Sequence, residues 1–189
     1  MTGDDESPVV LVVDDEPDLA DLYVAWLEDD YEVKVAYDGP TAIETLDASI
    51  DVVLLDRRMP NLSGDRVLDR IREKGLDCRV AMVTAVEPDV DIVDLGFDDY
   101  LQKPVDRSEL IDTVERLQRR ADYDMAVQDV FSAIRKRTLL EDRLSPSERS
   151  STEEFRELED EIRTLQEDVD DLTEDFDADD YSVLFQQID

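Results

Sequence analysis

The 189-residue sequence contains no histidine, and this absence excludes several kinds of chemistry. Without an imidazole, the chain cannot form a Ser-His-Asp or Cys-His nucleophile system, a zinc site with histidine ligands, or a phosphohistidine of its own. Its single cysteine, Cys78, cannot form an internal disulfide, and its apolar sequence context favours packing over reactivity. Any chemistry of this chain must therefore use carboxylates, hydroxyls and lysine.

Positive charge is also scarce. The sequence has 20 basic residues against 53 acidic ones, which gives a formal net charge of -33. Such a surface repels nucleic-acid phosphates and anionic membranes, so we expect no direct nucleic-acid binding. Most of the basic residues are arginine, and an acidic, lysine-poor composition is typical of salt-adapted proteins. At molar salt, a Debye length of about 3 Å would screen the self-repulsion.

Long hydrophobic runs are missing as well. No apolar run approaches the roughly 18 residues that a membrane-spanning helix needs. The first ten residues, MTGDDESPVV, lack the positively charged region of a signal peptide. We therefore expect a soluble, cytoplasmic protein without a membrane partner.

Five short apolar runs alternate with stretches in which apolar residues recur with helical periodicity. The runs cover residues 9–13, 31–36, 51–55, 79–83 and 98–101. This alternation predicts an α/β fold, with a five-stranded, parallel, doubly wound sheet of the flavodoxin-like type and helices on both faces. In such a sheet, ligands bind outside the carboxyl ends of the strands.

Beyond residue 120 the strand pattern stops and a helical pattern takes over, so we expect one domain over 8–120 and a helical accessory domain over 121–189. The helix that begins near residue 107 is expected to continue into the second domain. Ser145 and Glu148 have the spacing of a capping box, which predicts a break and a new helix there. Apolar residues from Phe155 to Phe176 then follow the 3-4 spacing of a coiled coil or helical hairpin.

Polar residues follow the strands that should end at the ligand-binding edge. Asp14 and Asp15 follow the first strand, Asp56 the third, Thr84 the fourth and Lys103 the fifth. Each has an ordinary structural explanation when taken alone, as a helix cap, a turn hydroxyl or a solvated amine. Those explanations do not account for their convergence on one edge. Three carboxylates together need a cation, and hard oxygen ligands suit Mg²⁺, so the pattern predicts a Mg²⁺ site.

The same residues indicate the reaction. Beside such a cation, Asp56 can act as a nucleophile toward a phosphoryl group, and Thr84 and Lys103 can neutralise the charge of the transferred oxygens. The stretches DDE, DRRMPNLSG, TA and KP appear in this order along the chain. With these motifs, residues 8–120 resemble the receiver domain of two-component response regulators.

The resemblance implies that Asp56 accepts a phosphoryl group from a sensor histidine kinase. It also implies that Asp15, Asp56 and the backbone carbonyl of Arg58 bind Mg²⁺ directly, and that Asp14 does so through water. No other cofactor is implied. Thr84 would bind the phosphoryl oxygens.

Lys103 would bind the same oxygens, and Thr84 and Tyr100 would form the conformational switch. The peptide bond before Pro104 is a candidate cis bond. Between Thr84 and Lys103 the expected helix is about one turn shorter than is usual in the family, so the family's ordinary dimerisation surface is not expected there.

The second domain resembles the HalX domain, a helical segment attached to receivers in haloarchaea. This resemblance agrees with the acidic composition and implies no biochemical role. Because a heptad seam leaves an apolar stripe that one helix cannot bury, we expect the tail to pack on itself, on the receiver or on a second copy. We therefore expect a downstream protein partner, and transcriptional output through partners.

Three other functions are each compatible with part of the sequence. Phosphatases of the haloacid dehalogenase type place a second aspartate two residues after the nucleophile, where this chain has Arg58, so we expect no enzyme that turns over external phosphate esters. A Mg²⁺-dependent aspartyl-phosphate hydrolase is the alternative function. A flavin-binding protein would need a phosphate-binding loop after the first strand, where three acidic residues stand instead. An unphosphorylated coiled-coil adaptor would not need the complete set of acidic residues, Thr84 and Lys103.

Overall fold

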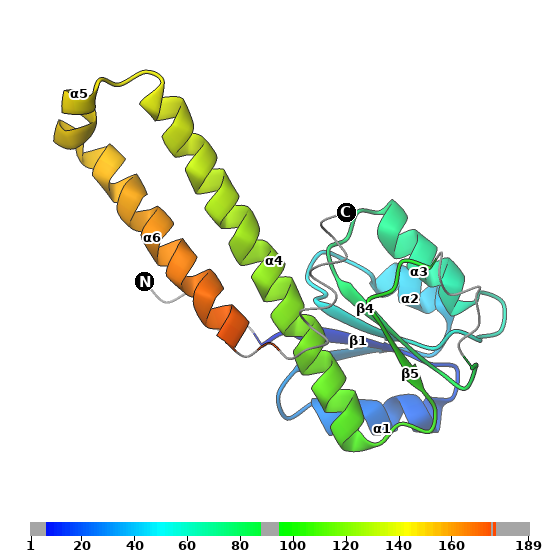
Figure 1. Cartoon of the computed structure of the whole chain (residues 1–189). Coiled ribbons are helices and arrows are strands. Elements are labelled where there is room, and N and C mark those ends of the chain that lie inside the picture. The colour runs from blue at the N-terminus through cyan, green and yellow to red at the C-terminus, as the bar shows by residue number, and fades with distance from the viewer. Residues whose placement is uncertain (1–6, 88–94, 175, 177–189) are drawn as a thin grey trace. The chain divides into compact units, whose positions relative to one another are not determined.

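The computed structural model describes residues 7–87, 95–174 and 176, and the chain divides into two compact units after Gln118. The first unit contains a five-stranded sheet in which all paired strands are parallel, in the order β2-β1-β3-β4-β5 (Figure 1). The strands are β1 (Val9–Val13), β2 (Glu32–Ala36), β3 (Val52–Leu55), β4 (Arg79–Thr84) and β5 (Asp99–Gln102). This sheet confirms the predicted fold class, and each strand lies within one residue of its predicted run.

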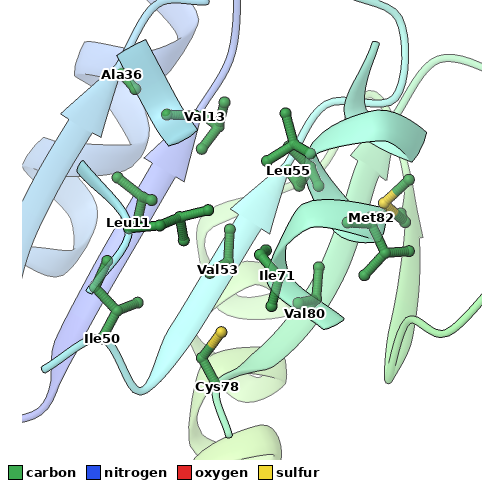
Figure 2. Packing of buried hydrophobic residues seen from close by; sticks show 14 of the residues in the cluster. Leu11, Val13, Ala36, Ile50, Val53, Leu55, Ile71, Cys78, Val80 and Met82 are labelled. Carbon is green, nitrogen blue, oxygen red and sulfur yellow. The ribbon is translucent and has the colours of Figure 1, made fainter. Parts of the chain in front are cut away.

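The strands read as nearly continuous apolar runs because both faces of the sheet are covered. All four residues of β3 are buried, as expected for a central strand of a parallel sheet. Alternate side chains enter two separate cores, so that Leu11 lies in one and Val12 in the other. Figure 2 shows the first core, where side chains from β1, β3 and β4 meet Ile71 of α3.

Among the residues that the structure describes, three helices connect strands of the first unit. They are α1 (Pro17–Leu27), α2 (Gly39–Thr45) and α3 (Gly64–Glu73). Helices α2 and α3 cover the first core, whereas α1 and the beginning of α4 cover the second. The Asp38 carboxylate caps α2 by accepting a hydrogen bond of 2.7 Å from the Thr41 N–H, which satisfies one of the donors left open at a helix start.

Helix α4 (Arg107–Glu141) is a single helix of 35 residues. Its first turns bury Leu110, Val114 and Leu117 in the second core of the sheet. The helix then continues into the second unit without a break, which confirms the predicted continuation. The Asp106 carboxylate begins it by accepting a hydrogen bond of 3.0 Å from the Glu109 N–H.

The second unit continues with α5 (Pro146–Ser151) and α6 (Glu153–Glu174). The predicted capping box at Ser145 and Glu148 is present. The prediction that the helix it starts would run on through the Phe155 seam is wrong, because that helix ends at Ser151. Thr152 then adopts an extended backbone, with φ of -86° and ψ of 120°, which interrupts the helical path, and its hydroxyl donates to the Glu148 carbonyl at 2.7 Å.

Helices α4 and α6 form a hairpin that buries its own apolar seam (Figure 1). Ala133 of α4 packs with Leu158 and Ile162 of α6, and all three are buried. Near the open end, the rings of Tyr123 and Phe176 lie 5.3 Å apart, between centroids. The structure therefore has the hairpin that the sequence offered as one of two alternatives.

Two sequence-based expectations concern other parts of the chain. The short helix expected after Thr84 falls largely on residues 88–94, which lie outside the described residues. Within the described residues, no helix combines the length and the apolar character that crossing a membrane requires.

Candidate functional site

The carboxyl ends of β1 and β3 bring three carboxylates together. These strands are neighbours, with Val13 paired to Leu55, so the residues that follow them emerge side by side. Asp14, Asp15 and Asp56 each offer a carboxylate oxygen within 4.8 Å of the other two. Asp14 is 2% exposed and Asp56 is 6% exposed, so two of the three negative charges lie almost out of water.

Lys103 supplies a positive charge to this cluster. Its Nζ donates to Asp14 Oδ2 at 2.7 Å and lies 3.6 Å from Asp56 Oδ2. The backbone places it there, because the Lys103 N–H donates to the Thr84 carbonyl at 2.9 Å and so extends the pairing of β4 with β5. The Lys103–Pro104 peptide bond is cis, as the resemblance suggested.

The surroundings of Asp56 oppose its ionisation. Burial raises the pKa of this carboxyl above its usual value, and the charge of Asp14 raises it further. The Lys103 ammonium and hydrogen bonds from the Thr84 hydroxyl and the Arg58 N–H lower the pKa in part. The hydroxyl of Thr84, a residue only 1% exposed, therefore points at the carboxylate that the sequence singled out.

The negative potential of the site extends to helix α1. Burial raises the pKa of Tyr23 to about 12, and the charges of Asp14, Asp56 and Glu16 add to this effect. A cation bound among these carboxylates, in addition to the Lys103 ammonium, would therefore be attracted by several negative charges at once.

The loop from Asp56 to α3 is shaped by backbone contacts. Gly64 packs so tightly that a Cβ there would lie 2.2 Å from the Asp56 carbonyl oxygen. Asn61 has a positive φ of 66°. This geometry explains why a glycine stands eight residues after Asp56, since any side chain at that position would push the loop away from β3.

Tyr100 lies apart from the carboxylates but contacts the loop after β4. Its hydroxyl donates to the Val86 carbonyl at 2.6 Å, and its ring lies 5.7 Å from that of Phe97, between centroids. The predicted switch pair, Thr84 and Tyr100, is therefore connected through the residues that follow Thr84 in the chain.

A cavity of about 470 Å³ opens between the loops that follow β3 and β4. It is lined by Arg57, Arg58, Met59, Ser63, Asp65, Val86 and Glu87. The acidic cluster itself does not line it, so the cavity lies beside the carboxylates and is formed largely by the residues that follow Asp56.

Comparison with known proteins agrees with this geometry. The sequence pattern of the response regulator receiver domain matches residues 10–115, which is more than half of the chain. The chain belongs to the response regulator family. A HalX domain matches residues 119–185, so the tail of this response regulator is the domain that its sequence resembled.

Related sequences carry names of transcriptional regulators. A Haloferax volcanii protein, provisionally named a transcriptional regulator, is 57% identical over 125 residues, which are 66% of this chain and 22% of that protein. The transcriptional regulatory protein CutR of Streptomyces coelicolor is 45% identical over 116 residues, which are 59% of this chain and 54% of CutR. The chain thus matches about a fifth of the first relative and about half of the second.

Solved receiver domains have the same fold. The receiver domain of the Francisella response regulator 1452 superposes with a TM-score of 0.54 and 32% identity, over 60% of this chain and 98% of that one. The Thermotoga maritima response regulator TrrA, determined in complex with Mg²⁺-BeF, superposes with a TM-score of 0.51 and 33% identity, over 58% of this chain and 98% of TrrA.

The acidic cluster of this receiver fits a divalent cation. Its donors are carboxylate oxygens, which are the ligands that Mg²⁺ prefers, and the three groups offer oxygens within 4.8 Å of one another. One ammonium, that of Lys103, approaches two of these carboxylates, so the group of three retains net negative charge.

The ion pair between Arg57 and Asp65 was not predicted from the sequence. Arg57 Nε lies 3.1 Å from Asp65 Oδ1 and 3.3 Å from Oδ2, and the pair joins the residue after Asp56 to the first turn of α3. The sequence signal for this ion pair was the presence of opposite charges eight residues apart. They stand on the two sides of a loop that must close tightly.

Proposed function

We propose that Asp56 accepts a phosphoryl group from a phosphohistidine of a sensor histidine kinase. The observation that carries this proposal is the position of its carboxylate, which is nearly buried among Asp14, Thr84 and Lys103 at the edge of the sheet. Membership of the receiver family implies a histidine kinase partner. Since this chain has no histidine, the donor imidazole must belong to that partner.

The transfer forms one bond and breaks another. A carboxylate oxygen of Asp56 attacks phosphorus, the phosphorus–nitrogen bond of the donor breaks, and its electron pair stays on the imidazole of the kinase. The product is an acyl phosphate on Asp56. Lys103 and the Thr84 hydroxyl are placed to donate to the transferred oxygens, where charge gathers during transfer.

Asp15 and Asp56, together with the backbone carbonyl of Arg58, would hold Mg²⁺ directly, and Asp14 would contact it through water. When bound, the cation supplies positive charge that offsets the repulsion between the carboxylates and the incoming phosphoryl oxygens. The cost of ionising Asp56 then falls, because the added positive charge opposes the effect of burial on its pKa.

Phosphorylation would change the contacts of Thr84 and so move the loop that Tyr100 binds. We propose that this change alters protein–protein interactions, with residues 8–120 as the phospho-acceptor domain and the HalX-type domain of residues 121–189 as the interaction element. The names of the relatives favour transcriptional regulation as the output. The acidic surface favours a route through a protein partner over direct contact with DNA.

The test is uptake of one phosphoryl group from a small phosphodonor, followed by mass spectrometry of the intact protein. We expect uptake to require Mg²⁺ and to be abolished by Asp56→Asn. A matched control is Asp69→Asn, which changes an exposed carboxylate on α3. Phosphorylation of Asp56→Asn at the normal rate, or normal uptake in the presence of a chelator, would contradict the proposed function.

A further inference from the structure

A backbone hydrogen bond and a side-chain ion pair close the loop that follows Asp56. At its base, the Gly64 N–H donates to the Arg57 carbonyl at 2.9 Å. Above this bond, the Arg57 side chain reaches across to Asp65, with Nε within 3.3 Å of both carboxylate oxygens. The residues between these contacts are therefore held as a closed turn whose two ends are β3 and α3.

The Arg57–Asp65 pair is well suited to holding this turn closed. Arg57 is only 9% exposed, whereas about a third of the Asp65 side chain is exposed, so salt weakens this half-buried pair less than it weakens a fully exposed one. Asp65 lies in the first turn of α3, where the helix dipole favours a carboxylate. Two donor–acceptor contacts from one nitrogen also restrict the direction of the side chain.

The Arg57 guanidinium contacts Asp65, in the first turn of α3. In the described residues, the cation recorded within ion-pair distance of Asp56 is Lys103, at 3.6 Å, whereas the guanidinium of Arg57 contacts Asp65. Arg57 is the residue immediately after Asp56 and immediately before Arg58. Its contact with Asp65 therefore restrains the path of the backbone through these three residues.

We propose that Arg57 and Asp65 are positioning residues that hold the backbone carbonyl of Arg58 where it can bind Mg²⁺. This inference rests on the proposed function of the site. A metal site built from two carboxylates and one carbonyl depends on the loop for its third protein ligand. Partners that orient a ligand commonly contribute about 10-fold to 100-fold to metal affinity.

The main test compares Asp65→Asn, which keeps the shape but removes the charge, with Asp65→Glu, which keeps a carboxylate that can reach the guanidinium. Mg²⁺ binding to the full-length chain is measured by calorimetry, and the Mg²⁺ dependence of phosphoryl uptake from a small phosphodonor is measured in parallel. We expect Asp65→Asn to weaken Mg²⁺ binding about tenfold while the rate at saturating Mg²⁺ is unchanged. Asp65→Glu should restore most of the affinity.

The control is Arg66→Ala, which removes the exposed pair with Asp69 on the same helix and should leave Mg²⁺ affinity unchanged. If Asp65→Asn caused a general loss of structure, the maximal rate and the melting temperature would both fall. Asp65→Glu would then not restore Mg²⁺ affinity independently of the rate. Equal Mg²⁺ affinity in wild type and Asp65→Asn would overturn the positioning role.

The two proposals fail differently. If the wild type binds Mg²⁺ but takes up no phosphoryl group, the proposed function is wrong and calorimetry still decides the role of Asp65. If the wild type takes up the phosphoryl group and Asp65→Asn has the same Mg²⁺ dependence, only the positioning role is wrong. Absence of Mg²⁺ binding by the wild type would overturn both.

Discussion

The surroundings of Asp56 raise the free energy of its ionised form in the folded chain. Burial and the charge of Asp14 raise the pKa of this carboxyl, so the folded chain binds a proton there more readily than the unfolded chain does. Folding stability contributed by this group is therefore greatest at low pH. It falls as pH rises from the ordinary pKa of an aspartate through the raised one.

This sign leads to a stability prediction for Asp56→Asn in the presence of a chelator. Above the raised pKa, we expect the variant to be more stable than the wild type, because it buries an amide in place of a desolvated charge. The difference should shrink as pH falls through that pKa. Thermal unfolding followed by circular dichroism over an acid-to-neutral series checks this.

Asp106 provides the opposite case. Hydrogen bonds from Ser108 and the Glu109 N–H lower the pKa of this exposed cap, so its contribution to stability is lost as pH falls. If the contributions of the two aspartates to stability changed in the same direction with pH, burial would not control the pKa of Asp56.

Lys103 contacts both Asp14 and the backbone of Thr84, so its removal should separate phosphorylation from the proposed response. In Lys103→Ala, we expect phosphoryl uptake to persist at saturating Mg²⁺, because the attacking carboxylate and the other carboxylates remain. The conformational response should be reduced, since the ammonium that would bind the new charge is missing. Hydrogen exchange of residues 84–87, with and without phosphodonor, measures the response.

Lys34→Ala is the control for this experiment, because that lysine pairs with Asp47 away from the acidic cluster. A response in Lys103→Ala equal to that of the wild type would remove Lys103 from the switch.

At the scale of elements, the turn between β3 and α3 determines whether the site is formed. Gly64→Ala would place a Cβ 2.2 Å from the Asp56 carbonyl oxygen, a distance at which the backbone must move. We expect a loss of about 1–3 kcal/mol in the free energy of unfolding, together with weaker Mg²⁺ binding. Denaturant unfolding and calorimetry measure the two effects.

Gly96→Ala serves as the matched glycine control. A Cβ at Gly96 would meet its nearest neighbour, the Arg72 side chain, at 3.7 Å, which is ordinary contact. If both glycine variants behaved alike, the tight packing of Gly64 against β3 would not be what requires glycine in the motif.

At the scale of the whole molecule, the chain combines a receiver unit with a helical hairpin that has a core of its own. Ile162 is buried in that core against α4, and Ile162→Ala should destabilise the hairpin by about 2–5 kcal/mol. The expected result is an earlier loss of helical signal on heating, while the Mg²⁺ affinity of the receiver is retained.

Leu139→Ala is the control, because this leucine is 62% exposed and its loss leaves no cavity. Unchanged helical stability in Ile162→Ala would contradict a packed hairpin. Light scattering of Leu139→Ala tests whether this exposed residue of α4 contributes to self-association.

The sequence by itself determined the sheet and the residues at its edge. Buried parallel strands consist of short runs of aliphatic residues, so the ends of these strands could be located to within one residue. The polar residues that follow the strands were then evident from the sequence. Asp14, Asp15, Asp56, Thr84 and Lys103 could therefore be grouped from strand ends and motif order. The roles assigned to them are predictions that the experiments above test.

Tertiary structure decided which of these groups pair. Lys103 bonds Asp14 across 89 positions of sequence, and this choice depends on strand register and on the path of two loops, which no local pattern encodes. The Arg57–Asp65 pair depends in the same way on how closely Gly64 allows the loop to approach β3. The break at Thr152 consists of one residue with an extended backbone between two helices, which the apolar periodicity on either side does not encode.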